Sequence, residues 1–512
     1  MARARYDIPM TNGLNFDGSK QGQNSPLVDQ EDAPVPPRYR WLKRFVILTT
    51  CLLFGVLLLR IYWGFEANRK LQSELDSYRS AGQPVYANEF DQRLDAVSDE
   101  GNAAVLLEEA VASLTMVASS GVSINDFVVD PQFFVTKKSD AAEVFNKNKP
   151  VLAMIHESRS KPNVSWSERL RDTAAPGFRP MLGTGQRNLA RLLWFAATYQ
   201  RQIGNDGGAI QTIHDFVSAC ESIESHPTLV ANLVSGATYD LAFTLIEDAT
   251  VGLEIEPAGA GWLPAHSPAS REQMEALLAT LVDEREFRRS AINASYGDRA
   301  QNVALIKSLD SRDRFGTFGG QPWHLRLWDR LVHVAQRPLY VLDLLESIRE
   351  STLSTEAIAQ NSWPDAKRLI PATPENRTLL TSMTRPMTDS PFGNRRKSTR
   401  KFVQIHFKCL ARRRMAATTV AILLFEKDHA RRPVSLAELV PNYLPIVPAD
   451  PFSADRADIR YEPRSEYPVL YSVGPNESDD GGQVAYDEYG RCDWTASDIL
   501  FELHGRRPRG SE

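Results

Sequence analysis

One pair of residues has the types and the spacing of a nucleophile beside a base: His406 and Cys409. They are three positions apart, about one turn of a helix. A histidine next to a cysteine can activate a thiolate, but the sequence names no third group to orient the imidazole. The chain also lacks the GxSxG, HExxH, P-loop and GxGxxG motifs. We therefore favour a structural role for this pair over a catalytic dyad.

The four cysteines do not form a recognisable metal or disulfide pattern. Cys51, Cys220, Cys409 and Cys492 are widely separated and include no CxxC pair, so they define neither a zinc site nor a disulfide framework. The composition, with 42% hydrophobic and 24% charged residues, is that of a globular protein. A chain of 512 residues is too long for one ordinary core, and its length favours about three domains.

Positive charge is concentrated in one segment. Residues 395–414 contain nine Lys or Arg and no Asp or Glu. The run could bind anionic headgroups or an acidic polymer of the cell envelope, or it could pair with acidic residues of the protein itself, and we favour internal pairing. Nucleic acid is a disfavoured partner because few aromatic residues interleave with the run and the whole chain has a net charge of −5. Acidic groups on other predicted helices, such as Asp283 and Glu284, are expected to be solvated.

A membrane anchor is predicted at residues 41–63. No charge occurs between Phe45 and Leu59, and residues 45–63 would span about 28 Å as a helix, close to the thickness of a bilayer core. Trp41 and Trp63 provide aromatic residues at both ends. The lipid bilayer is therefore an expected partner. Basic residues dominate the N-terminal flank, so we expect residues 1–40 to be a disordered cytoplasmic tail, the anchor to lie in the inner membrane, and the bulk of the chain to be extracytoplasmic.

The sequence between the anchor and residue 359 is mostly helical in pattern. Residues 64–97 are expected to form a stalk and linker. Residues 98–359 are expected to form a mainly α-helical domain built from helical hairpins, since amphipathic segments alternate with short turns. Within it, "INDFVVD" and "QFFVT" could be short strands, and Ser270 with Gln273 forms a capping box at the start of a helix. Pro338 indicates a break or kink.

The C-terminal part has a different pattern. Residues 360–394 contain five prolines and are expected to be a connector. No Gly or Pro occurs from 395 to 432, which predicts one long helix. "ADIRYEP", "YPVLYSVG" and "SDILFEL" alternate like strands of an antiparallel sheet. We thus expect a small α+β cap over residues 395–505 and a disordered tail over 506–512. The predicted fold class is mainly α, with a single transmembrane helix at the N-terminus.

The order of a long helix, "PVSLAELVPNYLPIVPADPF", "LYSVGPNESDDGG" and "SDILFEL" resembles the C-terminal domain of the major pseudopilins of type II secretion and their type IV pilin-like relatives. In that family a loop after the matching strand folds around calcium. The resemblance implies that calcium would be bound by the carbonyl of Leu470, the side chain of Ser472, and Asp479, Asp480 and Asp498. Without it, the same Asp-Asp-Gly-Gly run is interpreted as a solvated acidic turn.

The resemblance covers about 100 residues and does not extend to the anchor. Pseudopilins carry a cleavage site just before their membrane helix, and "PPRYRWLKRF" contains none. The layout of the whole chain also resembles single-pass envelope proteins of planctomycete-type bacteria. We expect a non-enzymatic scaffold or binding component of the envelope. The alternatives are an enzyme, or an enzyme-assisting subunit, with its active site in the helical middle, and a component of a secretion or pilus-like apparatus.

Overall fold

The structure is a computed structural model that describes residues 39–173, 183–256, 267–310, 323–370, 395–463, 468–483, 485 and 493–504. The expected cytoplasmic tail up to residue 38, most of the proline-rich connector, Cys492 and the C-terminal tail lie outside the described residues. The chain forms two compact units, Met1–Ile61 and Tyr62–Glu512. We call the second unit the body.

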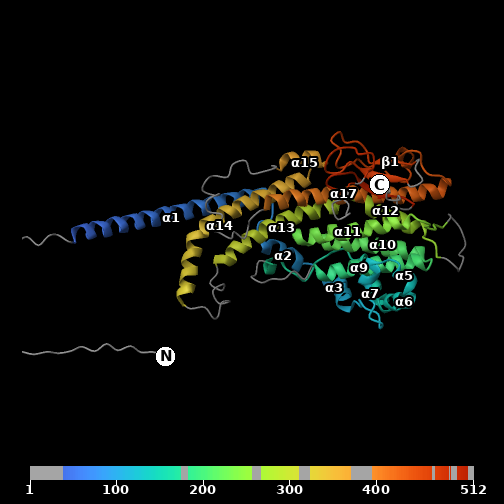
Figure 1. Cartoon of the computed structure of the whole chain (residues 1–512), viewed down its shortest axis with the longest axis horizontal. Coiled ribbons are helices and arrows are strands. Elements are labelled where there is room, and N and C mark those ends of the chain that lie inside the picture. The colour runs from blue at the N-terminus through green and yellow to red at the C-terminus, as the bar shows by residue number, and fades with distance from the viewer. Residues whose placement is uncertain are drawn as a thin grey trace, which may run out of the picture. The chain divides into compact units, whose positions relative to one another are not determined.

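Helices account for most of the described chain (Figure 1). They are α1 (Arg40–Ser80), α2 (Ala87–Asp95), η1 (Asp99–Gly101), α3 (Ala103–Ser113), α4 (Ile124–Val129), α5 (Phe133–Thr136), α6 (Lys138–Lys147), α7 (Lys149–Ser158), α8 (Leu170–Thr173), α9 (Thr184–Gln202), α10 (Asp206–Glu224), α11 (Leu229–Ala249), α12 (Arg271–Val282), α13 (Arg285–Asp310), α14 (Trp323–Ile358), α15 (Trp363–Leu369), α17 (Arg395–His429) and η4 (Leu436–Leu439). The strands are β1 (Arg460–Glu462), β2 (Val469–Ser472) and β3 (Ile499–Glu502).

Two of the described helices are long and apolar enough to cross a membrane. In α1 the apolar window has a mean hydropathy of 2.3 and none of it is buried, whereas 56% of the window in α11 is buried. Residues of α11 such as Tyr239, Phe243 and Ile246 belong to the main hydrophobic core. Helix α11 is therefore a core helix, and α1 is the candidate membrane span.

Part of the segment expected to be a stalk is packed within the body. Leu71, Leu75 and Tyr78 of α1 are buried in a cluster with Leu344 and Ile348 of α14. The apolar positions of α1 beyond residue 64 follow 3- and 4-residue spacings, which produce one buried stripe. The helix does continue beyond the apolar stretch to Ser80, and its last turns are packed against α14.

A buried arginine fixes the turn that follows α1. Arg299 of α13 is fully buried and donates hydrogen bonds to Oε1 of Gln83 (2.9 Å) and to the carbonyl oxygen of Pro84 (2.8 Å). Its guanidinium also lies over the rings of Tyr78 and Tyr296, 4.4 and 4.9 Å from their centroids. The turn between α1 and α2 is thus tied to α13 by one guanidinium, through two hydrogen bonds and the cation–π contact with Tyr78.

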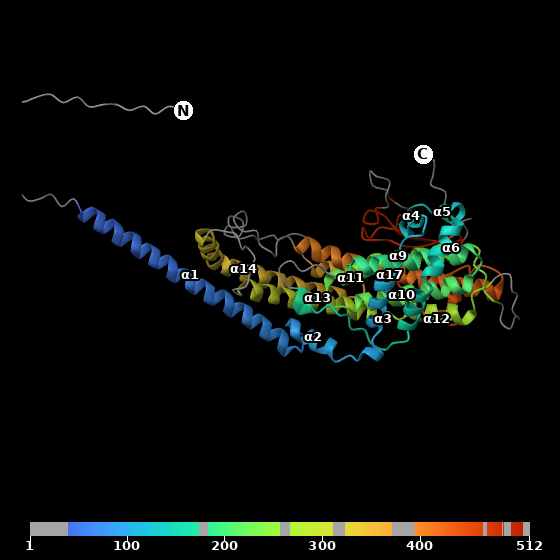
Figure 2. The same cartoon turned by 90° about the horizontal axis from the view of Figure 1, so that it is seen from below.

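The middle of the chain consists of helical hairpins, as predicted. Figure 2 shows α9, α10 and α11 lying alongside one another, and each neighbouring pair is in contact. The predicted capping box is present: Oγ of Ser270 accepts from the amide of Gln273, and Oε1 of Gln273 accepts from the amide of Ser270.

The two short strands expected near residue 130 are helices instead. "INDFVVD" contains α4 and "QFFVT" contains α5. The reason is a capping box between Ser123 and Asp126, which starts a helical turn and buries Phe127. The β-branched and aromatic residues that favoured strands here instead fill the core.

Pro338 lies inside α14, and the helix continues through it. Because proline lacks an amide hydrogen, one bond of the helical ladder is lost there. Figure 1 shows that the yellow N-terminal part of α14 points in a different direction from the rest of the helix.

In the described residues the three strands form one antiparallel sheet in the order β1-β2-β3. Tyr461 pairs with Leu470, and Leu470 pairs with Phe501. Every residue of the central strand β2 is buried, because the long helix α17 packs against β2 and β3. The predicted small sheet is confirmed.

The sheet does not have a core of its own. One hydrophobic cluster contains Leu107 of α3, Phe216 of α10, Phe407 of α17 and Phe501 of β3. The expected boundary between a helical domain at 98–359 and a cap at 395–505 therefore does not separate two cores.

Candidate functional site

The turn before β1 contains a buried carboxylate, that of Asp450, which contacts the end of strand β2. Asp450 precedes Pro451, and its Oδ1 accepts a hydrogen bond from the amide of Phe452, two residues on (2.9 Å), which is the local pattern of an Asx turn. The same carboxylate accepts from Oγ of Ser472 (2.6 Å) and from the amide of Val473 (2.9 Å). Burial raises the pKa of Asp450, and these hydrogen bonds oppose the rise.

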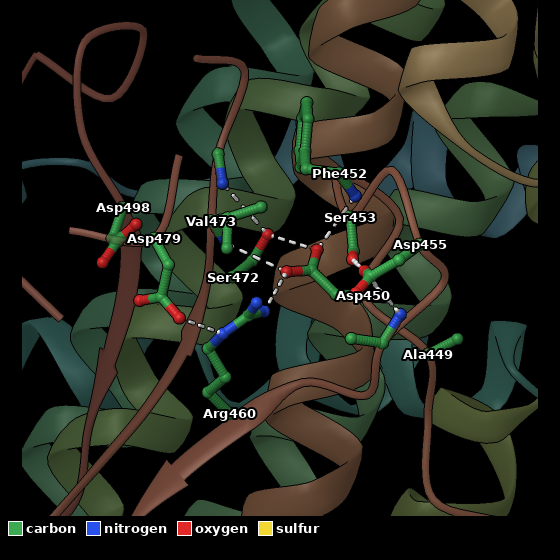
Figure 3. A network of polar contacts seen from close by, with 12 residues as sticks. Ala449, Asp450, Phe452, Ser453, Asp455, Arg460, Ser472, Val473, Asp479 and Asp498 are labelled. Carbon is green, nitrogen blue, oxygen red and sulfur yellow. Dashed lines mark hydrogen bonds and ion pairs between the residues drawn. The ribbon is translucent and has the colours of Figure 1, made fainter. Parts of the chain in front are cut away.

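Arg460 of β1 connects this carboxylate to the acidic loop after β2. Figure 3 shows its side chain between Asp450 and Asp479. Its Nε lies 2.6 Å from Oδ2 of Asp479, and its Nη1 lies 3.4 Å from Oδ2 of Asp450. Burial would raise the pKa of Asp479, but the hydrogen bond from the amide of Gly481 and the Arg460 guanidinium together hold this pKa below its usual value.

Asp498, just before β3, binds the C-terminal end of the acidic loop that follows β2. It is fully buried and accepts hydrogen bonds from the amides of Gly482 (2.7 Å) and Asp480 (3.3 Å). Gly482 has a φ of +71°, which an L-residue rarely adopts. Burial raises the pKa of Asp498, and the neighbouring charges of Asp480 and Asp479 raise it further.

The structure brings some of the predicted calcium ligands together and separates others. Asp479, Asp480 and Asp498 belong to one loop network. The hydroxyl of Ser472 is turned to Asp450, and Leu470 is buried in the middle of β2. No group of three or more His, Cys, Asp or Glu suited to a metal occurs among the described residues. In this arrangement the five predicted ligands do not converge, and calcium binding stays a prediction.

Sequence reasoning missed the two residues that connect this network. Asp450 and Arg460 together contact the turn, the sheet and the acidic loop. The available signal was the Asp-Pro dipeptide in "PADPF", which indicates a turn. No local pattern in the sequence indicates that Ser472, 22 residues away, donates a hydrogen bond to Asp450.

His406 and Cys409, for which the sequence favours a structural role, are both buried. His406 is buried and its ring stacks on Phe287 at a centroid distance of 4.8 Å. Burial lowers the pKa of His406 to about 3 and raises the pKa of Cys409 to about 12. At neutral pH both side chains are therefore uncharged, and the thiol is not the nucleophilic thiolate.

The basic run pairs with acidic residues of the body. Lys408 and Arg412 both contact Asp240 of α11, at 2.7 and 3.3 Å, and Arg412 also contacts Glu247 at 2.9 Å. Arg414 makes two hydrogen bonds with Glu284 (2.6 and 2.7 Å). The expectation of internal pairing is confirmed for these residues, and the expectation that Glu284 is solvated is corrected.

Arg413 is the most deeply buried cation among those side chains of this run that the structure describes. Its side chain is 1% exposed, contacts Oε1 of Glu221 at 2.8 Å, and donates to the carbonyl oxygens of Thr280, Leu281 and Asp283. Glu224 is also buried close to this guanidinium, and burial raises its pKa well above its usual value. Arg413 thus donates hydrogen bonds to carbonyl oxygens at the C-terminal end of α12. Its positive charge also lies beside the acidic residues of α10.

No family model, curated protein or solved structure matches the chain. The described residues define a mainly α-helical protein with a small antiparallel sheet and an exposed apolar helix near its N-terminus. The resemblance to pseudopilins stays a prediction.

Proposed function

We propose that the protein is a single-pass component of the cell envelope, held in the inner membrane by α1, with its N-terminus in the cytoplasm and its body outside. The observation that carries the proposal is the exposure of the apolar part of α1. Phe45, Leu52, Phe54 and Leu59 are each 55–67% exposed, and their apolar neighbours are exposed as well. An apolar surface of this extent is unstable in water and matches the interior of a bilayer.

Orientation follows from the charges beside the span. Arg40, Lys43 and Arg44 precede the apolar stretch, whereas the basic residues that follow it are mixed with acidic ones. Positive flanks remain on the cytoplasmic side of a membrane.

Within that location, we propose a non-enzymatic role as a scaffold or binding component. Several described groups whose types could do chemistry have contacts that hold the fold: Arg413 and Glu221 between helices, Asp450 at the end of β2, and the buried, uncharged His406 and Cys409. The alternatives are an enzyme, or an enzyme-assisting subunit, with its active site in the helical middle, and a component of a secretion or pilus-like apparatus.

The experiment is membrane retention of the full chain. Wild type should resist alkaline extraction, and protease should digest the body only from the extracytoplasmic side. Leu53→Arg combined with Val56→Arg should release the chain, since each central arginine costs about 3 kcal/mol of insertion free energy. Leu233→Arg, at a 41% exposed position of the other apolar helix, is the matched control and should be retained. Release of wild type by alkali, or digestion from the cytoplasmic side, contradicts the proposal.

A further inference from the structure

A cavity of about 550 Å³ opens where α1, α14, α15 and α17 meet in the body. Its volume is within the range of sites that bind small molecules. The lining residues used below are Lys70, Leu342, Leu345, Arg349, Leu353 and Ile370.

One wall of the cavity is apolar. Leu345 and Ile370 are 5% and 4% exposed, and Leu342 and Leu353 are half-buried beside them. Three leucines of α14 and Ile370, the residue after α15, thus line the cavity with aliphatic groups of the kind that an alkyl chain covers.

The rim of the cavity carries charges of both signs. Lys70 and Arg349 have side chains that are 57% and 62% exposed, and each has one acidic neighbour: Glu66 at 3.7 Å for Lys70 and Glu74 at 3.0 Å for Arg349. Glu346 and Glu350 line the same cavity and have contacts of their own. Two cations and two acids around an apolar wall complement a ligand with a phosphate, an ammonium group and an alkyl chain.

The position of the cavity along α1 favours the same ligand. Lys70 follows Trp63, the last aromatic residue of the predicted span, by seven residues of one helix, which is about 10 Å. If α1 is the anchor, the cavity opens at the depth of the lipid headgroups. This step rests on the proposed function.

We propose that the cavity binds one membrane phospholipid with a zwitterionic, ammonium-bearing headgroup. The phosphate is held by Lys70 and Arg349, the ammonium lies toward Glu346 and Glu350, and one acyl chain covers the leucine wall. The lipid ties α1 to α14 at the membrane surface.

The test is binding of phosphatidylethanolamine to the full chain in detergent, counted as bound lipid by native mass spectrometry. Wild type should bind one molecule, and bind phosphatidylglycerol at least tenfold more weakly. Arg349→Gln should weaken binding about tenfold, the usual loss for one hydrogen bond to a charged group. Glu74→Gln breaks the same ion pair but keeps the cation, so its affinity should stay within twofold of wild type. Equal losses in these two variants would overturn the proposal.

A second pair of variants tests the apolar wall. Leu353→Trp should fill the cavity and abolish binding, while Leu233→Trp, on the exposed face of α11, should not affect it. If Leu353→Trp folds and leaves lipid binding unchanged, a lipid in this cavity is excluded. Should Leu353→Trp fail to fold, Lys70→Gln, at an exposed position, decides by its expected tenfold loss.

Failure of this proposal is distinguishable from failure of the anchor. Chain that resists alkaline extraction but binds no phospholipid overturns only the lipid site. Chain that is released by alkali overturns the anchor, and with it the reason for a lipid at this depth.

Discussion

The hydroxyl of Ser472, in the central strand, lies 2.6 Å from the carboxylate of Asp450, in the turn that precedes the sheet. The same carboxylate accepts hydrogen bonds from the amides of Val473 and Phe452. One buried side chain therefore fixes both the end of β2 and the turn. This contact holds in place the acidic loop in which calcium binding is predicted.

Replacing this carboxylate should destabilise the protein. Asp450→Ala leaves two amides and a hydroxyl buried without their acceptor, and we expect the free energy of unfolding to fall by about 3 kcal/mol or more. Urea denaturation followed by circular dichroism measures it. Asp458→Ala, at an exposed position eight residues on, should change stability by about 0.5 kcal/mol or less. Similar losses in both variants would show that the network around Asp450 contributes little.

Because Arg413 is buried and Arg431 is exposed, replacing each of them should lower the free energy of unfolding by a different amount. Arg413→Met strands Glu221 and three carbonyl oxygens in the interior, and should lower the free energy of unfolding by about 3–5 kcal/mol. Arg431→Met breaks an ion pair with Glu438 at the surface and should lower it by about 1 kcal/mol at most. The two variants can be compared in one denaturation series. An Arg413→Met protein as stable as Arg431→Met would mean that these buried groups are hydrated.

Glu247 should make stability depend on pH near neutrality. Burial raises its pKa from 4.5 to about 7, against the opposing effect of Arg412. The folded state therefore binds this proton more tightly than the unfolded state, and its contribution to stability is present below pH 4.5 and is lost as pH rises to about 7.

The measurement compares wild type with Glu247→Gln in urea at two pH values. Because the variant cannot ionise, its stability relative to wild type should rise by about 2 kcal/mol between roughly pH 5 and pH 7.5. The difference between the two proteins cancels the titration of all other groups. A difference that does not change with pH would place the pKa of Glu247 near its ordinary value.

Calcium should act through the acidic loop. The charges of Asp480 and Asp479 raise the pKa of Asp498, so a divalent cation at this loop would relieve their repulsion. We expect calcium at about 100 times its dissociation constant to stabilise wild type by about 2.7 kcal/mol, and excess chelator to reverse it. The variant Asp479→Ala/Asp480→Ala should not respond. If wild type does not respond either, the loop is an acidic turn held by Arg460 and Asp498.

The helices and the sheet could be predicted because their signals are local. Ser270 and Gln273 cap a helix three residues apart, and the strand ending at Ser472 alternates before a Gly-Pro turn. The prediction was wrong at "INDFVVD", where strand-favouring residues follow a helix cap, because local preference for a strand is weaker than the cap and the burial of Phe127 together.

The contacts within the candidate site could not be predicted because their partners are distant in sequence. Glu284 was expected to be solvated, yet its carboxylate binds Arg414, 130 residues away. The sequence shows that both charges exist, but the packing of α17 against α12 decides that they meet. The same is true of Asp450 and Ser472.

The shared core has a consequence for timing. Leu107 and Leu503 belong to the same hydrophobic cluster, so nearly 400 residues must be present before that cluster can close. At the usual speed of synthesis this takes roughly 20–80 seconds. Over that interval α9, α10 and α11 exist without α17, and their apolar faces are open to other chains. A cell that makes this protein must therefore keep a long, nearly finished polypeptide from aggregating until its last strand arrives.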